Sequence, residues 1–279
     1  MDFDSLHQKV STSDVPFLQQ EVSGSGVTFL PQKVSIMGVP FYAGTLESLV
    51  DHLIDLAQSE KNNRCIYPSD AHVLVHADKD PSYKNILRAS YLNLPDGMPI
   101  VWLGRWMGFN KMKRCYGPDL FKMMMMSSAQ KPIRHFLCGG KEGIAVALKE
   151  ICSKRFGNQQ IVGTYAPPFR EMTDDEMKEL GEMILAAQAD VVWIGLGAPK
   201  QEKFAHRLSS FTKTSLLITV GAAFDFHTNQ VKQAPRWMQQ SGMEWLFRMM
   251  MEPKRLGKRY AIVIPKFLQL AIRQLFHQH

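Results

Sequence analysis

The residues DVVWIGLGAPKQE, positions 190–202, decide the fold expected of this chain. The run of valine, tryptophan and isoleucine that ends at Gly195 is typical of a strand buried on both faces of a parallel sheet. Glycine and proline then indicate a turn, and a helix is expected over residues 200–208. A strand followed directly by a helix is the repeating unit of α/β proteins, whose ligands bind beyond the carboxyl ends of the strands.

The same alternation continues outward from this stretch in both directions. The pattern predicts strands at 34–39, 64–67, 91–94, 135–138, 160–164 and 216–220. It predicts helices at 45–58, 71–89, 99–107, 118–129, 142–155 and 174–188, the last beginning with a capping box formed by Thr173 and Glu176. We therefore expect an α/β protein with a Rossmann-like, mostly parallel sheet and helices on both of its faces.

The excess positive charge lies at one end of the sequence. Residues 231–279 hold nine basic and two acidic residues, a difference equal to the net charge of +7 of the whole chain. Trp237, Trp245, Leu246 and Phe247 are interleaved with these cations, which is typical of a helix at a membrane surface. We expect a flexible leader at 1–32, an α/β body at 33–230 and a basic amphipathic helical appendage at 231–279 that meets a polyanionic partner.

Export and membrane insertion are not predicted. The N-terminus lacks the basic start and apolar run of a signal peptide, and no apolar stretch reaches the roughly 20 residues of a spanning helix. The four cysteines form no C-x-x-C pair and lie in or beside apolar stretches, which favours reduced core residues in a cytoplasmic protein. They are Cys65, Cys115, Cys138 and Cys152.

Two of the predicted strand ends carry candidate site residues with a competing interpretation. Asp96 follows a strand and precedes a turn glycine, so it could act as a general base on a hydroxyl group. An Asp-Gly turn with a helix-capping role explains the same residues equally well. Gly139 and Gly140 precede a helix whose amides could hold a phosphate, although strand-to-helix turns also use glycine for steric reasons.

Two further strand ends suit a nucleotide or a sugar diphosphate. Lys200 and Gln201 follow Gly197 in the first turn of a predicted helix, where a cation and an amide could meet a diphosphate. The alternative is a capped helix with solvated ends. Phe224 and Asp225 could stack on a base and bind a ribose, or Phe224 could belong to the core and Asp225 could cap the next turn.

Metal and dinucleotide sites are weakly supported. His72 and His76 lie four residues apart near Asp70, but no third ligand has suitable spacing, so no metal is expected. No G-x-G-x-x-G follows the first strand of a βαβ unit, which argues against a dinucleotide oxidoreductase.

Taken in order, eight stretches resemble the WecG/TagA/CpsF family of bacterial glycosyltransferases, and GAPKQE and EWLFR are the specific strings among them. They span nearly all of the chain beyond the leader, at residues 94–97, 114–120, 139–140, 161–164, 195–202, 220–225, 232–235 and 244–255. Residues 68–72 depart from the family's common Thr-Pro-Asn-Ala-Glu, which leaves open whether the sugar is N-acetylmannosamine, its uronic acid or glucose.

The resemblance implies an inverting, metal-independent and cofactor-free transfer from a UDP-sugar to a polyprenyl-diphosphate-linked saccharide in cell-surface or exopolysaccharide synthesis. It implies a peripheral protein on the anionic inner face of the cytoplasmic membrane, with no nucleic-acid partner, and it leaves a homo-oligomer open. By motif, Asp96 would be the catalytic base. The donor pocket would be lined by Arg114, Gly139, Gly140, Gly197, Lys200, Gln201, Phe224 and Asp225. The diphosphate groups and lipid headgroups would meet Arg248, Arg255, Lys258 and Arg259.

Two other classes of function stay open from the residues alone. A nucleotide-binding peripheral membrane module without catalysis would account for the basic tail but would leave Asp96 without a role. A soluble Rossmann-type oxidoreductase or methyltransferase would account for the glycine turns but not for the tail.

Overall fold

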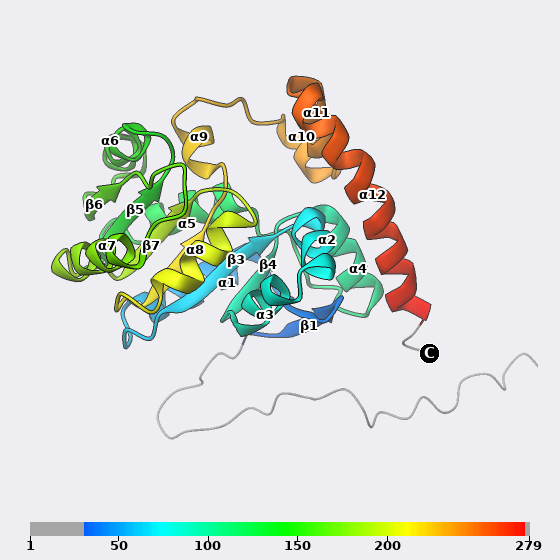
Figure 1. The fold of residues 1–279 in the computed structure, drawn as a ribbon, viewed down its shortest axis with the longest axis horizontal. Helices are drawn as coiled ribbons and strands as arrows, with labels where there is room; N and C mark the ends of the chain where they lie inside the picture. The colour runs from blue at the N-terminus through cyan, green and yellow to red at the C-terminus, as the bar shows by residue number, and fades with distance from the viewer. Residues whose placement is uncertain (1–30, 277–279) are drawn as a thin grey trace, which may run out of the picture. The chain divides into compact units, whose positions relative to one another are not determined.

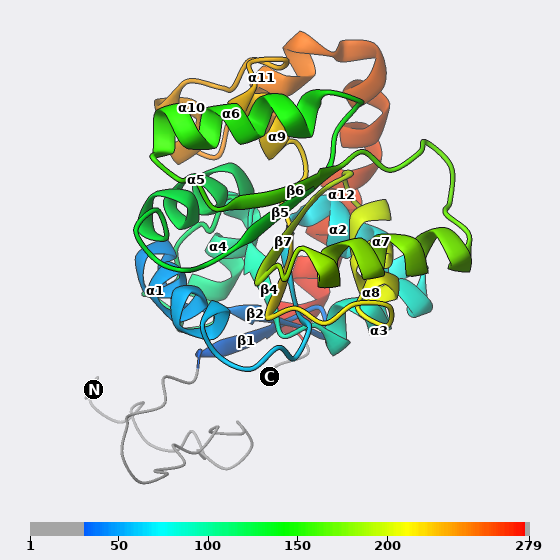
Figure 2. The same ribbon diagram turned by 90° about the vertical axis from the view of Figure 1, so that its left-hand side faces the viewer.

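The fold is built on one eight-stranded sheet in the order β1-β2-β4-β3-β8-β7-β5-β6 (Figure 1, Figure 2). The computed structural model describes residues 31–276, apart from the side chains of Gln240 and Arg255, so the leader expected at 1–32 lies almost entirely outside it. Neighbouring strands pair in parallel except β1 with β2. The strands are β1 (Lys33–Ile36), β2 (Val39–Tyr42), β3 (Arg64–Ser69), β4 (Leu92–Pro95), β5 (His135–Gly139), β6 (Ile161–Tyr165), β7 (Val191–Gly195) and β8 (Leu216–Thr219).

Helices cover both faces of the sheet, and a separate hydrophobic cluster fills each side. One cluster takes side chains from α2 (Ala71–Lys79), α3 (Pro81–Ala89), α4 (Met98–Trp106), α7 (Asp174–Ala186), α8 (Lys200–Leu208) and α12 (Pro253–Phe276). The other takes side chains from α1 (Leu46–Ala57), α5 (Gly117–Ser127), α6 (Ile144–Phe156) and α9 (Ala223–His227). The predicted α/β architecture is confirmed.

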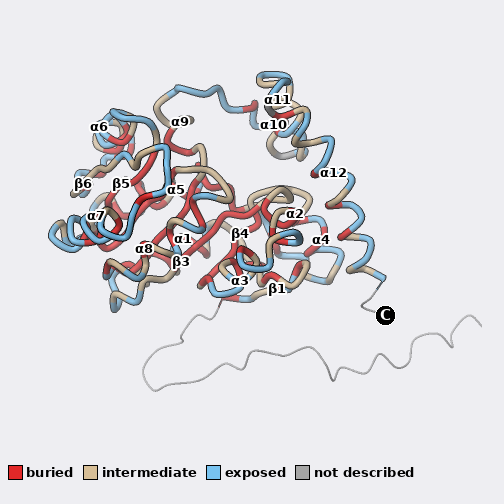
Figure 3. The backbone as a smooth tube through the Cα atoms, viewed as in Figure 1, coloured by how far each residue is buried: buried red, intermediate tan, exposed pale blue. Residues whose placement is uncertain are grey.

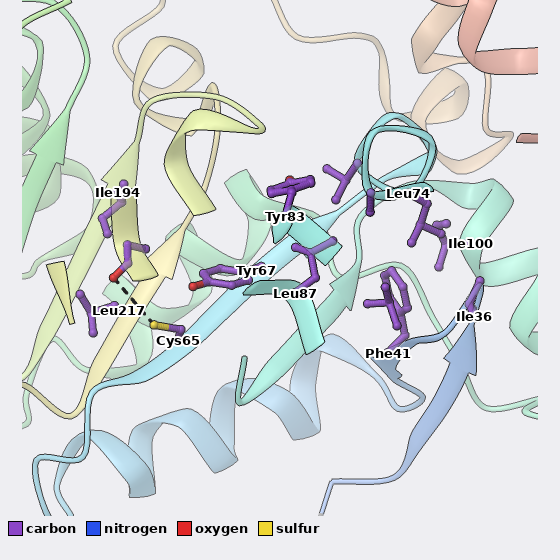
Figure 4. Packing of buried hydrophobic residues seen from close by; sticks show 14 of the residues in the cluster. Ile36, Phe41, Cys65, Tyr67, Leu74, Tyr83, Leu87, Ile100, Ile194 and Leu217 are labelled. Atoms are coloured by element: carbon purple, nitrogen blue, oxygen red, sulfur yellow. Dashed lines mark hydrogen bonds between the residues drawn. The ribbon is translucent and has the colours of Figure 1, made fainter. Parts of the chain in front are cut away.

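The central strands are apolar along their whole length because successive side chains point alternately into the two hydrophobic clusters, one on each face of the sheet. In β3, Tyr67 faces the cluster on the α2 side, whereas Ile66 belongs to the opposite cluster. Figure 4 shows Tyr67 near Tyr83 of α3 and Leu87. In Figure 3 the buried residues follow the strands and the inner sides of the helices. All four cysteines are buried, as their apolar surroundings predicted.

Two predicted elements differ from the structure. The strand expected at 34–39 is instead the β1–β2 hairpin, because Met37 and Gly38 turn the chain with positive φ angles of 52° and 76°. The helix expected at 71–89 is two helices. Asp80 caps the second by accepting a hydrogen bond from the Tyr83 amide at 3.0 Å, and Pro81 has no amide hydrogen with which to continue the first.

The C-terminal residues form α10 (Arg236–Gln240), α11 (Glu244–Met251) and α12, and α12 lies beside α2 (Figure 1). Its inner face carries the buried residues Val263, Phe267 and Leu270. Lys266 pairs with Asp78 of α2 at 3.3 Å. Within residues 31–276, no helix is long and apolar enough to cross a membrane.

Candidate active site at the carboxyl edge of the sheet

Asp96 and Asp70 lie side by side because they follow neighbouring parallel strands. Pro95, the last residue of β4, is in register with Ser69 at the end of β3, and the Asp96 amide donates to the Ser69 carbonyl oxygen at 3.1 Å. On its other side β3 pairs with β8, so this edge lies where the first and second halves of the chain meet in the sheet. Open α/β sheets bind ligands at such a position.

Asp96 is half-buried, and burial raises its pKa to about 7. The Arg114 guanidinium opposes this rise, whereas the carboxylates of Asp70 and Glu244 add to it. Its Oδ1 accepts a hydrogen bond from the Gly117 amide at 3.2 Å. The capping residue of α4 is Gly97, which makes no side-chain cap, so Asp96 does not cap the helix that follows it. A carboxyl group with such a pKa can accept a proton near neutral pH.

Arg114 joins the Asp96 loop to the tail. Its Nε donates to the Asp96 carbonyl oxygen, and its Nη2 donates to Glu244 of α11 at 2.6 Å. The guanidinium lies over the Tyr116 ring at 4.1 Å from the ring centroid, and the Tyr116 hydroxyl donates to the other Glu244 oxygen at 2.8 Å. The predicted donor-pocket residue is therefore engaged in holding α11 against the strand ends.

Tyr260 of the tail lies near several charged residues of the candidate site. Tyr260 of α12 contacts Trp245 of α11, with ring centroids 5.7 Å apart. Burial raises the pKa of Tyr260, and the charges of Arg248, Asp70, Arg259 and Glu244 also act on it. Two arginines of the basic appendage and Asp70, at the end of β3, therefore lie close enough to Tyr260 for their charges to act on it.

The four tail cations predicted to meet diphosphate groups and lipid headgroups differ in their surroundings. The Arg248 guanidinium lies 5.9 Å from the centre of the Phe226 ring. Burial lowers the pKa of His72, and nearby Arg259 lowers it further against the effect of Asp70. Lys258 is exposed. The Arg255 side chain lies outside what the structure describes.

Gln201 holds two glycine turns together. Its Oε1 accepts hydrogen bonds from the Gly197 amide at 3.2 Å and the Gly221 amide at 2.9 Å. Its Nε2 donates to buried Glu202 at 2.8 Å, which in turn accepts from the Tyr83 hydroxyl at 3.0 Å. Gln201 is thus buried, and its side-chain oxygen and nitrogen both form hydrogen bonds within the protein. It supports the turns of the predicted donor pocket and does not face a ligand itself.

The glycines at the strand ends serve different purposes. Gly197 has a φ of 75°, and a Cβ built there would meet no atom within 4 Å, so the turn leaves open space beside it. Lys200, three residues on, is exposed. A Cβ at Gly139 would lie 2.5 Å from the Gly195 carbonyl oxygen, so close approach of β5 and β7 requires glycine there. Helix α6 begins only at Ile144, so Gly139 and Gly140 do not form its first turn.

Phe224 is not available to stack on a ligand. Its side chain is buried in the core, 6.0 Å from Phe121 between ring centroids, so the stacking role predicted for it is wrong and the core interpretation holds. Asp225 is half-buried, and burial raises its pKa while nearby Lys141 lowers it. Its carboxylate accepts no hydrogen bond from any residue that the structure describes, so it is free to bind a ligand hydroxyl.

Sequence reasoning missed Glu244, Tyr116 and Tyr260 as members of this site. Glu244 is one of only two acids in the basic tail, and that imbalance is the signal that could have identified it.

His72 and His76 stack edge to face with ring centroids 6.5 Å apart. Nowhere in the described part of the chain do three His, Cys, Asp or Glu side chains gather as metal ligands would.

Known proteins resemble this chain over most of its length. The sequence model of the Glycosyl transferase WecG/TagA/CpsF family matches residues 34–279. The chain is 28% identical over 229 residues to the N-acetylglucosaminyldiphosphoundecaprenol N-acetyl-beta-D-mannosaminyltransferase of Bacillus subtilis (strain 168), covering 82% of this chain and 87% of that protein. It is 26% identical over 233 residues to the protein of the same name from Bacillus spizizenii (strain ATCC 23059 / NRRL B-14472 / W23), covering 84% and 88%.

Proposed function

This chain belongs to the WecG/TagA/CpsF family of glycosyltransferases, and we propose from this that it moves a sugar from a UDP-sugar to a polyprenyl-diphosphate-linked saccharide. Both Bacillus relatives are named as N-acetylmannosaminyltransferases that act on a lipid-diphosphate N-acetylglucosamine. We therefore assign N-acetylmannosamine as the first sugar to test and N-acetylglucosamine as the sugar of the acceptor.

The observation that carries the proposal is the half-buried Asp96, whose loop is tied through Arg114 to Glu244 of the tail. In the proposed reaction Asp96 takes the proton of an acceptor hydroxyl group, whose oxygen forms a bond to the anomeric carbon of the donor sugar. The bond from that carbon to the diphosphate breaks, and UDP leaves with the electron pair. Attack from the side opposite the leaving group inverts the anomeric carbon.

The leaving UDP needs compensating positive charge, and the tail offers it. The charges of Arg248 and Arg259 lower the pKa of Tyr260, and that of Asp70, at the end of β3, raises it, so these residues lie near one another. We propose that the two arginines face the departing diphosphate. Arginine suits this role because its planar guanidinium can bind two phosphate oxygens at once. We propose that Asp225 and the turns at Gly197 and Gly221 hold the nucleoside part, with Gln201 keeping the two turns in place.

We also propose that residues 231–279 hold the protein at the inner face of the cytoplasmic membrane, where the acceptor lipid is anchored. Each basic residue near an anionic surface contributes about 1 kcal/mol, so several together can retain a protein there. The division into a body at 33–230 and an appendage from 231 remains part of this proposal.

A donor panel tests the proposal. The purified protein is incubated with a short-chain polyprenyl-diphosphate N-acetylglucosamine and, separately, with UDP-N-acetylmannosamine, its uronic acid or UDP-glucose. Transfer is expected from one donor, and Asp96→Asn should lower it by about 10²-fold or more. Asp51→Asn, at an exposed position of α1, is the matched control and should transfer at the parental rate. Equal activity of both variants would refute the role of Asp96.

A further inference from the structure

Helix α4 presents two tryptophans to solvent on one side. Trp102 is 51% exposed and Trp106 is 78% exposed. Residues four apart lie on the same face of a helix, so the two indoles are neighbours. The opposite face of α4 carries the buried residues Ile100 and Gly104. Neither the core nor the candidate active site accounts for this pair of exposed aromatic side chains.

Both ends of α4 contact the tail. A Cβ built at Gly242, in the turn between α10 and α11, would lie 2.9 Å from the Trp102 ring, so Trp102 lies against that turn. Met107 directly follows α4, and its sulfur accepts a hydrogen bond from Gln274 of α12 at 3.4 Å. Helix α4 therefore runs along the tail from the α10–α11 turn to the end of α12.

The tail carries its own exposed apolar stripe. At 100° per residue, Ile264, Leu268 and Ile272 fall on one side of α12, and all three are exposed. The helix packs on α2 through a different side, where Lys266 pairs with Asp78. Of the 18 large hydrophobic side chains that are exposed in the described residues, 12 belong to α4 or to residues 237–276. Exposed apolar groups are thus concentrated on these two adjoining segments.

The charge around α4 matches that of the tail. Residues 97–118 contain no aspartate or glutamate and four basic residues, which are Arg105, Lys111, Lys113 and Arg114. The first three are exposed. An apolar aromatic surface bordered by cations is complementary to an anionic lipid surface, where indole rings lie at the level of the headgroups.

We propose that Trp102 and Trp106 dock on an anionic lipid bilayer together with the tail, so that α4 of the body is part of the membrane-binding surface. The inference rests on the membrane association in the proposed function, and it extends that surface beyond residues 231–279. Because α4 begins two residues after Asp96, docking of α4 places the end of β4 close to the bilayer surface. A lipid-linked diphosphate would meet Asp96 at that level.

Co-sedimentation of the full chain with vesicles tests the inference. Vesicles of phosphatidylcholine with phosphatidylglycerol are compared with vesicles of phosphatidylcholine alone, in the absence of substrates. Trp106→Ser should weaken binding to the anionic vesicles by about tenfold, the order expected for one large apolar side chain withdrawn from the lipid. Phe169→Ser is the matched control, because Phe169 is 86% exposed but lies outside both segments, and it should bind as the parent does.

Trp106 is the better site for the test, because Trp102 also contacts the α10–α11 turn and its loss could disturb the fold. Since Trp106 is exposed, the melting temperature of Trp106→Ser should stay close to that of the parent. Parental vesicle binding by Trp106→Ser would overturn the inference. So would a dimer that depends on Trp106 while vesicle binding is unchanged, because the patch would then serve a second copy of the chain. Since no substrate is present, loss of vesicle binding supports the inference even if no sugar transfer is found.

Discussion

The assignment of Asp96 as a base predicts how activity depends on pH. The pKa of Asp96 is raised to about 7, chiefly by burial, and a base works only when it is deprotonated. With that pKa, about 9% of the protein carries an ionised Asp96 at pH 6 and about 91% at pH 8. The value of kcat/KM should therefore rise roughly tenfold between these pH values. An ordinary aspartate would already be ionised at pH 6 and would give no rise.

Asp70→Asn tests whether the neighbours of Asp96 set this pKa. The Asp70 carboxylate is one of the charges that raise it, so its removal should lower the pKa of Asp96 and move the rise in activity to lower pH. Asparagine can still accept the hydrogen bond from the Val73 amide that caps α2, so the helix should keep its start. Asp51→Asn should leave the profile unchanged.

The assay measures UDP release at constant ionic strength from pH 5.5 to 8.5, with circular dichroism recorded at each pH to show that the protein stays folded. Saturating and limiting donor concentrations separate kcat from kcat/KM. A flat profile over this range would refute the raised pKa of Asp96. A rise that moves to higher pH in Asp70→Asn would refute the electrostatic explanation.

Three other predictions follow from the site and the tail. EDTA should leave transfer essentially intact, because the tail arginines are proposed to offset the charge of the leaving diphosphate; a strict requirement for added Mn²⁺ or Mg²⁺ would contradict this. Arg114→Lys should lower kcat by about tenfold or more, because an ammonium group cannot keep the contacts to both Asp96 and Glu244, and parental kcat would disprove that linking role. Removal of residues 231–279 should abolish transfer, should strongly weaken vesicle binding and should lower the melting temperature, because Val263 and Phe267 lose their buried contacts. A truncated protein that transfers sugar at the parental rate would show that the tail is dispensable.

Local patterns predicted the strands and helices well, because a buried strand such as β7 requires an apolar run and a turn requires residues that permit it. The β1–β2 hairpin was missed because its turn is formed by Met37 as well as Gly38, and methionine is not a typical turn residue. The order of strands could not be predicted, because the position of β8 between β3 and β7 depends on contacts between distant segments.

In the candidate site, too, local sequence patterns identify some residues, whereas the roles of others depend on contacts between distant segments. Asp96 and Gly197 could be identified because Asp96 directly follows β4 and Gly197 lies two residues beyond the end of β7, and all parallel strands end at one edge. The burial of Phe224 depends on its packing against Phe121 from another helix, which no local pattern contains. The contact of Glu244 with Arg114 spans 130 residues and could be found only from the fold.

The most direct test of the central claim is the mass of the lipid product. The protein is incubated with UDP-N-acetylmannosamine and polyprenyl-diphosphate N-acetylglucosamine, and the lipid fraction is analysed by mass spectrometry beside Asp96→Asn. We expect one N-acetylhexosamine to be added to the acceptor by the parent and almost none by the variant. Release of UDP without any gain in mass of the lipid, from this donor or from any other of the panel, would contradict the proposed transfer.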